Sequence, residues 1–122
     1  MIKVLLVDDN EPLREALAEA LDDRGIIVVG QAINGQEACD AVLELEPDVV
    51  VMDIRMPDMS GPDATSWLAR NCPGVRVVGL TAYDDDALHQ EMSRAGAHSV
   101  LVKGASIKTI VNATGDAGSV RS

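Results

Sequence analysis

Five side chains able to do chemistry together stand at the ends of apolar runs in this sequence. They are three carboxylates, one hydroxyl and one ammonium: Asp8, Asp9, Asp53, Thr81 and Lys103. Carboxylates with no histidine or cysteine beside them are the ligands that Mg²⁺ or Mn²⁺ prefers. A carboxylate beside such a cation can act as an oxygen nucleophile toward a phosphoryl group. We therefore expect Asp53 to attack, Thr81 to donate a hydrogen bond, and Lys103 and the metal to offset charge on the phosphoryl oxygens.

The three carboxylates cannot be brought together without compensation. Two unit charges about 4 Å apart repel by roughly 4 kcal/mol at an effective dielectric of about 20. The cluster must be partly protonated, paired with Lys103, or bound to a divalent cation. We favour the cation, because one ammonium does not balance three acids. Helix capping is the competing role for Asp8 and Asp9, but Asn10 already supplies a cap. Thr81 alone is equally typical of an ordinary strand.

The elements that must position these residues alternate along the chain. The five apolar runs, each followed by a helical pattern, are residues 2–7, 26–29, 49–52, 75–80 and 100–102. Short connections between alternating strands and helices predict an α/β fold, a doubly wound parallel sheet with helices on both faces. The unbroken apolar run at 49–52 indicates a strand buried on both faces. The polar residues after four of the five strands should then meet at one edge, where ligands bind in such sheets.

Several helix boundaries can also be predicted. Asn10 is a good cap for the first helix, and Gly25 is suited to follow its end. Asn34 and Glu37 have the spacing of a capping box for the second helix. The fourth helix, opening at residues 83–86, has the sparsest apolar stripe and should be the least firmly packed. We expect the domain to span residues 1–114, with residues 115–122 a linker or disordered tail.

Composition narrows the class of function. The 122 residues are enough for one domain, and the formal net charge is −10. An acidic chain is a poor match for direct nucleic-acid or anionic-membrane binding and favours a cation or a basic partner. Cys39 and Cys72 lack metal or redox spacing and are expected to be reduced packing residues. No apolar run is long enough for a signal peptide or a membrane span, so we expect a cytoplasmic protein.

Four motifs in order along the chain resemble the receiver domain of bacterial two-component response regulators. They are Val-Asp-Asp-Asn at 7–10, Val-Val-Met-Asp-Ile-Arg-Met-Pro-Asp-Met-Ser-Gly at 50–61, Leu-Thr-Ala at 80–82 and Val-Lys at 102–103. The resemblance spans nearly the whole chain. It implies a flavodoxin-like (βα)5 fold, and the strand order 2-1-3-4-5 that we expect rests partly on it.

The resemblance also implies roles for individual residues. Asp53 would be the phosphoacceptor. Mg²⁺ would be bound directly by Asp9 and Asp53, through water by Asp8, and by the backbone carbonyl of Arg55. Thr81 would be the switch hydroxyl.

Lys103 would be the lysine that pairs with the phosphate. The phosphodonor would be a phosphohistidine on a sensor histidine kinase, and the domain would catalyse its own phosphorylation and slow dephosphorylation rather than turn over a substrate repeatedly. Tyr83 and Arg55 stand where residues of such domains tune hydrolysis.

Two positions depart from the family pattern. Val100 stands three residues before the lysine, where the family usually has an aromatic residue that swings inward, so the output is expected to be weakened or relocated. Gly104 stands where a proline usually follows the lysine in a cis peptide bond. A cis bond without proline costs roughly 3 kcal/mol. Either that strain is retained or the loop is trans and Lys103 is displaced.

The resemblance suggests partners beyond the kinase. The fourth helix and fifth strand are a candidate surface for a homodimer or another partner. Residues 81–86 and 103–106 resemble receivers joined to a C-terminal helix-turn-helix DNA-binding domain, which suggests transcription regulation. Two alternatives remain: a degenerate receiver acting as a scaffold without phosphorylation, and a Mg²⁺-dependent phosphohydrolase. A flavin-binding module of the same fold is set aside, because no hydroxyl-rich phosphate loop follows the first strand.

Overall fold

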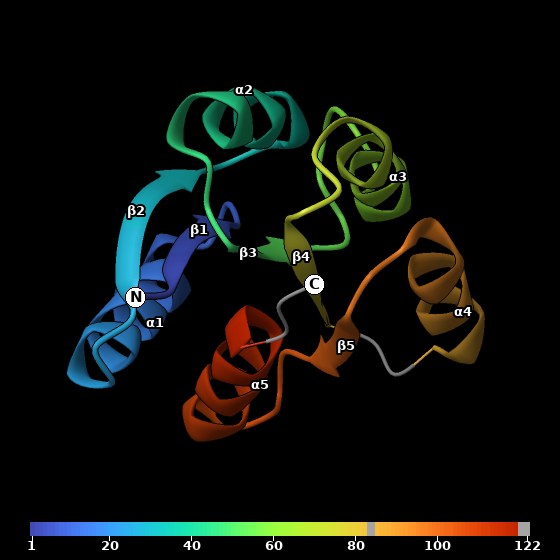
Figure 1. The fold of residues 1–122 in the computed structure, drawn as a ribbon. Coiled ribbons are helices and arrows are strands. Elements are labelled where there is room, and N and C mark those ends of the chain that lie inside the picture. The colour runs from blue at the N-terminus through green and yellow to red at the C-terminus, as the bar shows by residue number, and fades with distance from the viewer. Residues whose placement is uncertain (83–84, 120–122) are drawn as a thin grey trace.

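A five-stranded parallel sheet lies between two layers of helices (Figure 1). The computed structural model describes residues 1–82 and 85–119. The strand order is β2-β1-β3-β4-β5, as predicted. The strands are β1 (Lys3–Val7), β2 (Ile27–Ala32), β3 (Val49–Asp53), β4 (Arg76–Thr81) and β5 (Ser99–Val102). The helices are α1 (Glu11–Asp23), α2 (Gly35–Leu45), α3 (Gly61–Asn71), α4 (Asp86–Ala95) and α5 (Ile107–Ser119).

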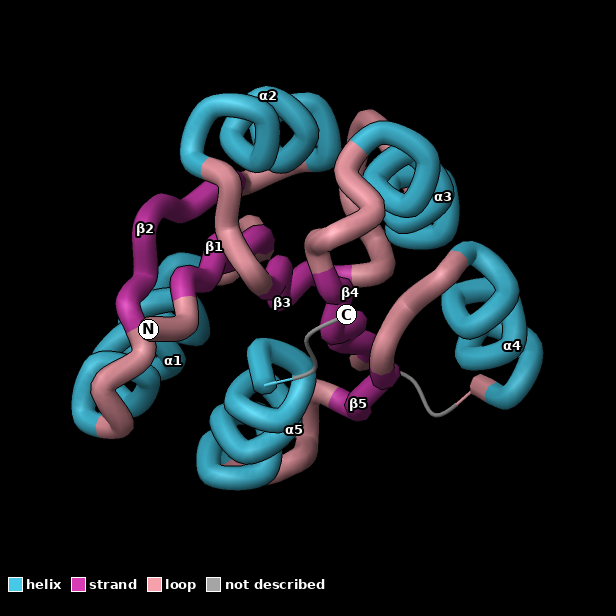
Figure 2. Tube along the Cα trace, in the orientation of Figure 1, coloured by secondary structure: helices cyan, strands magenta, loops and turns pink. Residues whose placement is uncertain are grey.

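Each face of the sheet has its own hydrophobic core. Helices α1 and α5 cover one face, and α2, α3 and α4 cover the other (Figures 1 and 2). Because side chains alternate along a strand, Val4 and Leu6 pack toward α1 and α5, whereas Leu5 and Val7 pack on the opposite side. All five residues of β3 are buried, which confirms the prediction of a central strand covered on both faces.

The predicted start and end of α1 are confirmed. The Asn10 side chain accepts a hydrogen bond from the backbone N–H of Leu13 at 3.1 Å. Gly25 follows the capping residue Arg24 with a φ of 75°, a conformation that glycine adopts without steric cost. Helix α1 therefore begins at Glu11, two residues after Asp9 of the acidic pair that follows β1.

The prediction of a linker or disordered tail from residue 115 is wrong for residues 115–119. Helix α5 continues to Ser119, and Ala117 and Gly118 are buried within it. A Cβ on Gly118 would lie 2.6 Å from Cγ2 of Ile2, so glycine lets the helix approach the start of β1 closely. The glycines that suggested a linker are thus packing residues. Residues 120–122 lie outside the described residues.

Helix α4 is attached to the sheet by few buried side chains. It contributes one buried residue, Met92, whereas each of the other four helices contributes two or more. The methyl carbon of Met92 would lie 2.7 Å from a Cβ placed on Gly79, so it occupies the space above that glycine. The helix begins at Asp86 and is capped by Asp85. The expected opening at Tyr83 and Asp84 lies outside the described residues.

Two smaller predictions concern the cysteines and the membrane. Cys39 and Cys72 are both free thiols, the first buried and the second half-buried against the core. Of the helices in the described parts of the chain, none has the length and apolarity needed to cross a bilayer.

The turn into α3 depends on a close backbone approach at Gly61. Its N–H donates to the carbonyl oxygen of Ile54 at 2.7 Å. A Cβ at this position would lie 2.6 Å from Cα of Ile54 and 2.8 Å from its carbonyl oxygen. Those atoms belong to the backbone at the end of β3, so they cannot move aside as a flexible side chain would.

We predict that Gly61→Ala lowers the free energy of unfolding by about 2 kcal/mol, because the added methyl overpacks against backbone. Urea denaturation measures the loss. Gly74→Ala is the matched control, since no atom lies within 4 Å of its added Cβ, and it should change stability by less than about 0.5 kcal/mol. Equal midpoints for the two variants would contradict the close approach.

Candidate functional site

Strand register brings the predicted carboxylates to one edge of the sheet. In the parallel pairing of β1 with β3, Val7 lies beside Met52. The residues that follow these two, Asp8 and Asp53, therefore emerge as neighbours at the carboxyl ends of adjacent strands. Asp9 comes next along the chain, before α1 begins.

The hydroxyl and the ammonium come from the next two strands. Thr81 ends β4 and lies beside Val102 of β5. The backbone N–H of Lys103 donates to the carbonyl oxygen of Thr81 at 2.6 Å. The bond after Lys103 is trans, as are all peptide bonds in the described parts of the chain. Lys103 is not displaced by this trans bond, because its Nζ lies beside the acids at the edge of the sheet.

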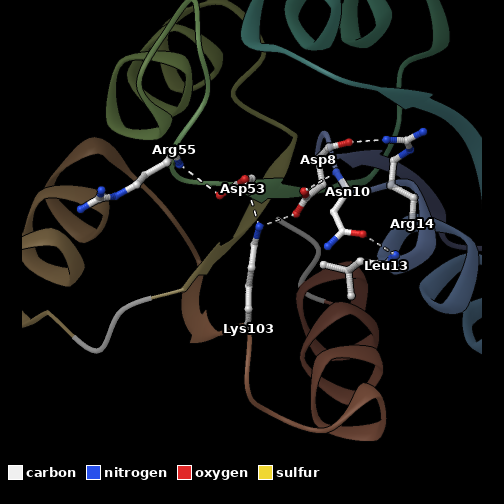
Figure 3. A network of polar contacts seen from close by, with 7 residues as sticks. All are labelled: Asp8, Asn10, Leu13, Arg14, Asp53, Arg55 and Lys103. Carbon is white, nitrogen blue, oxygen red and sulfur yellow. Dashed lines mark hydrogen bonds and ion pairs between the residues drawn. The ribbon is translucent and has the colours of Figure 1, made fainter.

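The Lys103 ammonium lies between two buried carboxylates (Figure 3). Its Nζ is 2.9 Å from Oδ2 of Asp8 and 3.1 Å from Oδ2 of Asp53. Asp8 and Asp53 are only 3% and 6% exposed, so solvent screens these ion pairs weakly. The structure thus brings together the three acids and Lys103. Thr81 is buried and ends the adjoining strand β4, directly after Leu80, which pairs with Asp53.

The three carboxylates can share one cation. Asp8, Asp9 and Asp53 each offer an oxygen, and these atoms lie within 4.8 Å of one another. Three oxygen donors without histidine or cysteine suit Mg²⁺, which binds to a few carboxylates and completes its shell with water. Asp9 is exposed while the other two acids are buried, so one side of the cluster faces solvent. The donor set therefore fits the metal that the sequence implies.

Arg55 contributes its backbone to the same cluster. Its N–H donates to Oδ1 of Asp53 at 3.1 Å, and its side chain extends away from Asp53 in Figure 3. The two oxygens of Asp53 therefore have different partners, a backbone amide on one and the Lys103 ammonium on the other.

Burial and hydrogen bonding shift the pKa of Asp53 in opposite directions. Removal from water raises its pKa, and the neighbouring Asp8 raises it further, while the hydrogen bonds from the Arg55 backbone and from Lys103 act to lower it. The pKa remains above its ordinary value. For Lys103, burial favours the neutral amine, but the hydrogen bonds and charges of Asp8 and Asp53 outweigh it and raise the pKa of the ammonium. One cation thus compensates Asp53 only in part.

Sequence reasoning missed the groups that hold Asp8 in place. The Arg14 guanidinium donates one hydrogen bond to the carbonyl oxygen of Asp8 (Figure 3). It donates another, at 2.9 Å, to the side chain of Gln31. The backbone N–H of Asn10 donates to Oδ1 of Asp8 at 2.9 Å. Arg14 lies off the apolar face of α1, and nothing in the sequence spacing links it to Asp8 or to Gln31.

Comparison with known proteins identifies the family. Residues 4–114 match the family model described as the response regulator receiver domain. The transcriptional regulatory protein LnrK of Bacillus subtilis is 44% identical over 114 residues, which are 93% of this chain and 52% of LnrK. The response regulator GacA of Pseudomonas syringae is 40% identical over 114 residues, 93% of this chain and 53% of GacA. The chain spans about half the length of these curated relatives.

Solved structures agree with this match. The signal receiver domain of the response regulator NarL from Mycobacterium tuberculosis superposes with a TM-score of 0.93 at 30% identity, covering 98% of both chains. The response regulator domain of Thermotoga maritima CheB superposes with a TM-score of 0.89 at 29% identity, covering 100% of this chain and 99% of that one. The order of motifs, the sheet topology and these matches together show that the chain belongs to the response regulator receiver domain family.

Proposed function

We propose that this receiver is a phosphorylation-controlled switch in which Asp53 accepts a phosphoryl group from a sensor histidine kinase in a Mg²⁺-dependent reaction. The observation that supports this most directly is the position of the Asp53 carboxylate. It forms an ion pair with the Lys103 ammonium and lies beside the acids Asp8 and Asp9. The metal would be held directly by Asp9 and Asp53, through water by Asp8, and by the carbonyl of Arg55, with Mn²⁺ able to substitute. When bound, it would neutralise charge on the phosphoryl oxygens.

The protein groups divide the remaining work. A carboxylate oxygen of Asp53 forms the new bond to phosphorus, and the bond from phosphorus to the kinase histidine breaks, its electron pair passing to the leaving imidazole. The Arg55 amide holds Oδ1 of Asp53. Lys103 then exchanges its contact with Asp53 for one with a phosphoryl oxygen, and the Thr81 hydroxyl donates to another.

Movement of Thr81 toward the phosphoryl group would carry the signal to α4 and β5. Helix α4 is suited to shift, because Met92 is its only buried residue. Val100 is half-buried and packs in the core on the α4 side of the sheet. A valine has no ring to exchange between two positions, so the output of this receiver would depend on repacking of α4. Its targets would be a second copy of the chain through α4 and β5, or an output domain that regulates transcription.

The rival functions have less support. A degenerate scaffold would not need an ammonium within 3.1 Å of Asp53 and a complete acid cluster. A phosphohydrolase would need further groups that bind and release a substrate repeatedly, whereas the acid cluster of the described residues is compatible with one small cation. Autophosphorylation with slow self-hydrolysis is the reaction that the site supports best.

Incubation with Mg²⁺ and acetyl phosphate tests the phosphoacceptor. We predict that the wild type gains one phosphoryl group, measured by intact-protein mass spectrometry, and that Asp53→Asn gains none, because an amide is not a nucleophile of this kind. Asp63→Asn, an exposed acid in the first turn of α3, is the matched control and should be phosphorylated normally. Phosphorylation that persists in Asp53→Asn would overturn the assignment.

The metal site can be tested through stability. A cation bound only by the folded state should raise the free energy of unfolding by about 2.7 kcal/mol at a concentration 100 times its Kd. We predict this gain for the wild type in Mg²⁺ and its loss in Asp9→Asn, whose side chain is exposed and whose replacement leaves the core untouched. Urea denaturation with and without Mg²⁺ measures both. An equal gain in the variant would exclude Asp9 as a ligand.

The raised pKa of Asp53 predicts a pH dependence in the absence of metal. The folded state retains the proton of Asp53 above the ordinary pKa of 3.8. The associated stability is fully present below that value and is lost as pH rises through the folded-state pKa. Asp53→Asn has no such charge to bury, so its stability relative to the wild type should increase between about pH 4 and pH 8. Urea melts across this range, without Mg²⁺, measure the difference; a constant difference would refute the interpretation.

A further inference from the structure

We propose that Asp58 is a positioning residue for the metal site. By accepting hydrogen bonds from the N-terminus of α2, it fixes the loop on which Arg55 lies. This inference rests on the proposed Mg²⁺-dependent function. It concerns the loop of residues 54–60, which joins β3 to α3 and carries the backbone of Arg55 past Asp53.

Asp58 is attached to α2 by both of its carboxylate oxygens. Oδ1 accepts from the backbone N–H of Gly35 and Oδ2 from that of Gln36, each at 2.9 Å. These hydrogen bonds hold the pKa of Asp58 below its ordinary value, although the side chain is exposed. A carboxylate at the positive end of a helix is also favoured by the helix dipole.

The cap of α2 is thus shared between two parts of the chain. Asn34 accepts from the N–H of Glu37 at 2.9 Å, as predicted for the helix cap. Glu37 reaches back to the N–H of Ile33 at 3.3 Å, one residue earlier than the predicted capping box requires. The two remaining N–H groups of the first turn are those that Asp58 binds. Helix α2 would have two unsatisfied donors there without the loop.

Side-chain packing reinforces the same connection. A Cβ on Gly35 would lie 2.7 Å from Cβ of Met59, so the absence of a side chain at Gly35 is what lets the loop lie against α2. Met59 is half-buried and packs against the core on that side of the sheet. The middle of the loop therefore has both a polar and an apolar attachment to α2.

The ends of the loop are fixed independently. The N–H of Ile54 donates to the carbonyl of Leu80 at 2.9 Å, and the N–H of Gly61 donates to the carbonyl of Ile54 at 2.7 Å. Between these points, the Asp58 carboxylate ties the loop to α2 through its two hydrogen bonds. Asp58 lies three residues from Arg55. Loss of its hydrogen bonds to α2 would therefore release the segment that carries the expected carbonyl ligand.

Asp8 and the loop that carries Arg55 are both hydrogen-bonded to one segment of the chain, the turn between β2 and α2. The N–H of Asp8 donates to the carbonyl of Ala32, the last residue of β2, at 3.1 Å. Asp58 binds Gly35 and Gln36, which begin α2 directly after that strand. The turn from β2 to α2 thus sets the position of Asp8 and of the Arg55 loop relative to each other. Ligand geometry held by such outer contacts commonly affects metal affinity.

The test is the Kd for Mg²⁺, measured by isothermal titration calorimetry on the unphosphorylated chain. We expect Asp58→Ala to raise the Kd by about fivefold, less than the roughly tenfold or larger effect of removing a group that contacts a ligand directly, because Asp58 acts through the loop. Asp58→Asn removes the same charge but keeps one acceptor oxygen, so it should fall between Asp58→Ala and the wild type. Asp63→Ala removes a nearby exposed charge without a contact to α2 and should change the Kd by less than about twofold.

The outcomes separate a positioning role from capping alone. If Asp58→Ala lowers the thermal midpoint while its Kd matches that of Asp63→Ala, Asp58 merely caps α2 and the inference is wrong. Gly35→Ala supplies a test without any change of charge, because its methyl displaces Met59, and it should also raise the Kd. Failure of the wild type to bind Mg²⁺ would overturn the proposed function and this inference together.

Discussion

Three carboxylates and one ammonium lie together at the carboxyl edge of the sheet, and the need to compensate their charge is the main constraint on the site. Two carboxylates there are almost entirely removed from solvent, and the Lys103 ammonium lies within ion-pair distance of both. A third acid completes the cluster from the solvent side. Burial of charged groups is tolerated only when partners compensate them. When all three acids are ionised, their negative charge exceeds the positive charge of Lys103, so a divalent cation bound there would lower the cost of burying them.

The topology explains how such a site can exist in a stable protein. Parallel strands end at the same edge, so residues far apart in sequence meet without any long connection. The strands beneath them are apolar on both faces, and the two cores they form supply the stability that the acidic edge does not. Backbone groups then orient the acids: the amide of Asn10 holds Asp8, and that of Arg55 holds Asp53. The three acids and Lys103 therefore lie at the carboxyl edge of the sheet, and none of them is a member of the two hydrophobic cores.

Much of this arrangement could be predicted from the sequence, because it follows from periodicity and from residues at strand ends. The buried run at Val49–Asp53 and the carboxylate that ends it indicated both a central strand and a nucleophile. The strand order needed the resemblance to a family as well. The C-terminal boundary was wrong, because Gly118 has the composition of a linker but the role of a close contact with Ile2. Local composition does not reveal what a glycine will meet in the folded chain.

The supporting contacts could not be predicted, because they join residues that no local pattern connects. Arg14 reaches the carbonyl of Asp8 and the side chain of Gln31, and Asp58 reaches the start of α2, 22 and 23 residues earlier in the chain. Their roles depend on how α1, α2 and the loop after β3 lie in space. Such contacts are visible only once the helices are placed on the sheet. The candidate site residues were therefore easier to predict than the residues that hold them in place.

We propose that Asp53 receives the phosphoryl group within a cation site shared with the acids after β1. A crystal structure of the chain with Mg²⁺ and beryllofluoride, a mimic of the phosphoryl group, tests this most directly. We expect beryllium bonded to a carboxylate oxygen of Asp53, the metal in contact with Asp9, and Nζ of Lys103 moved from Asp53 to a fluorine. Beryllofluoride bound to another acid, or a metal bound without Asp9 and Asp53, would contradict it.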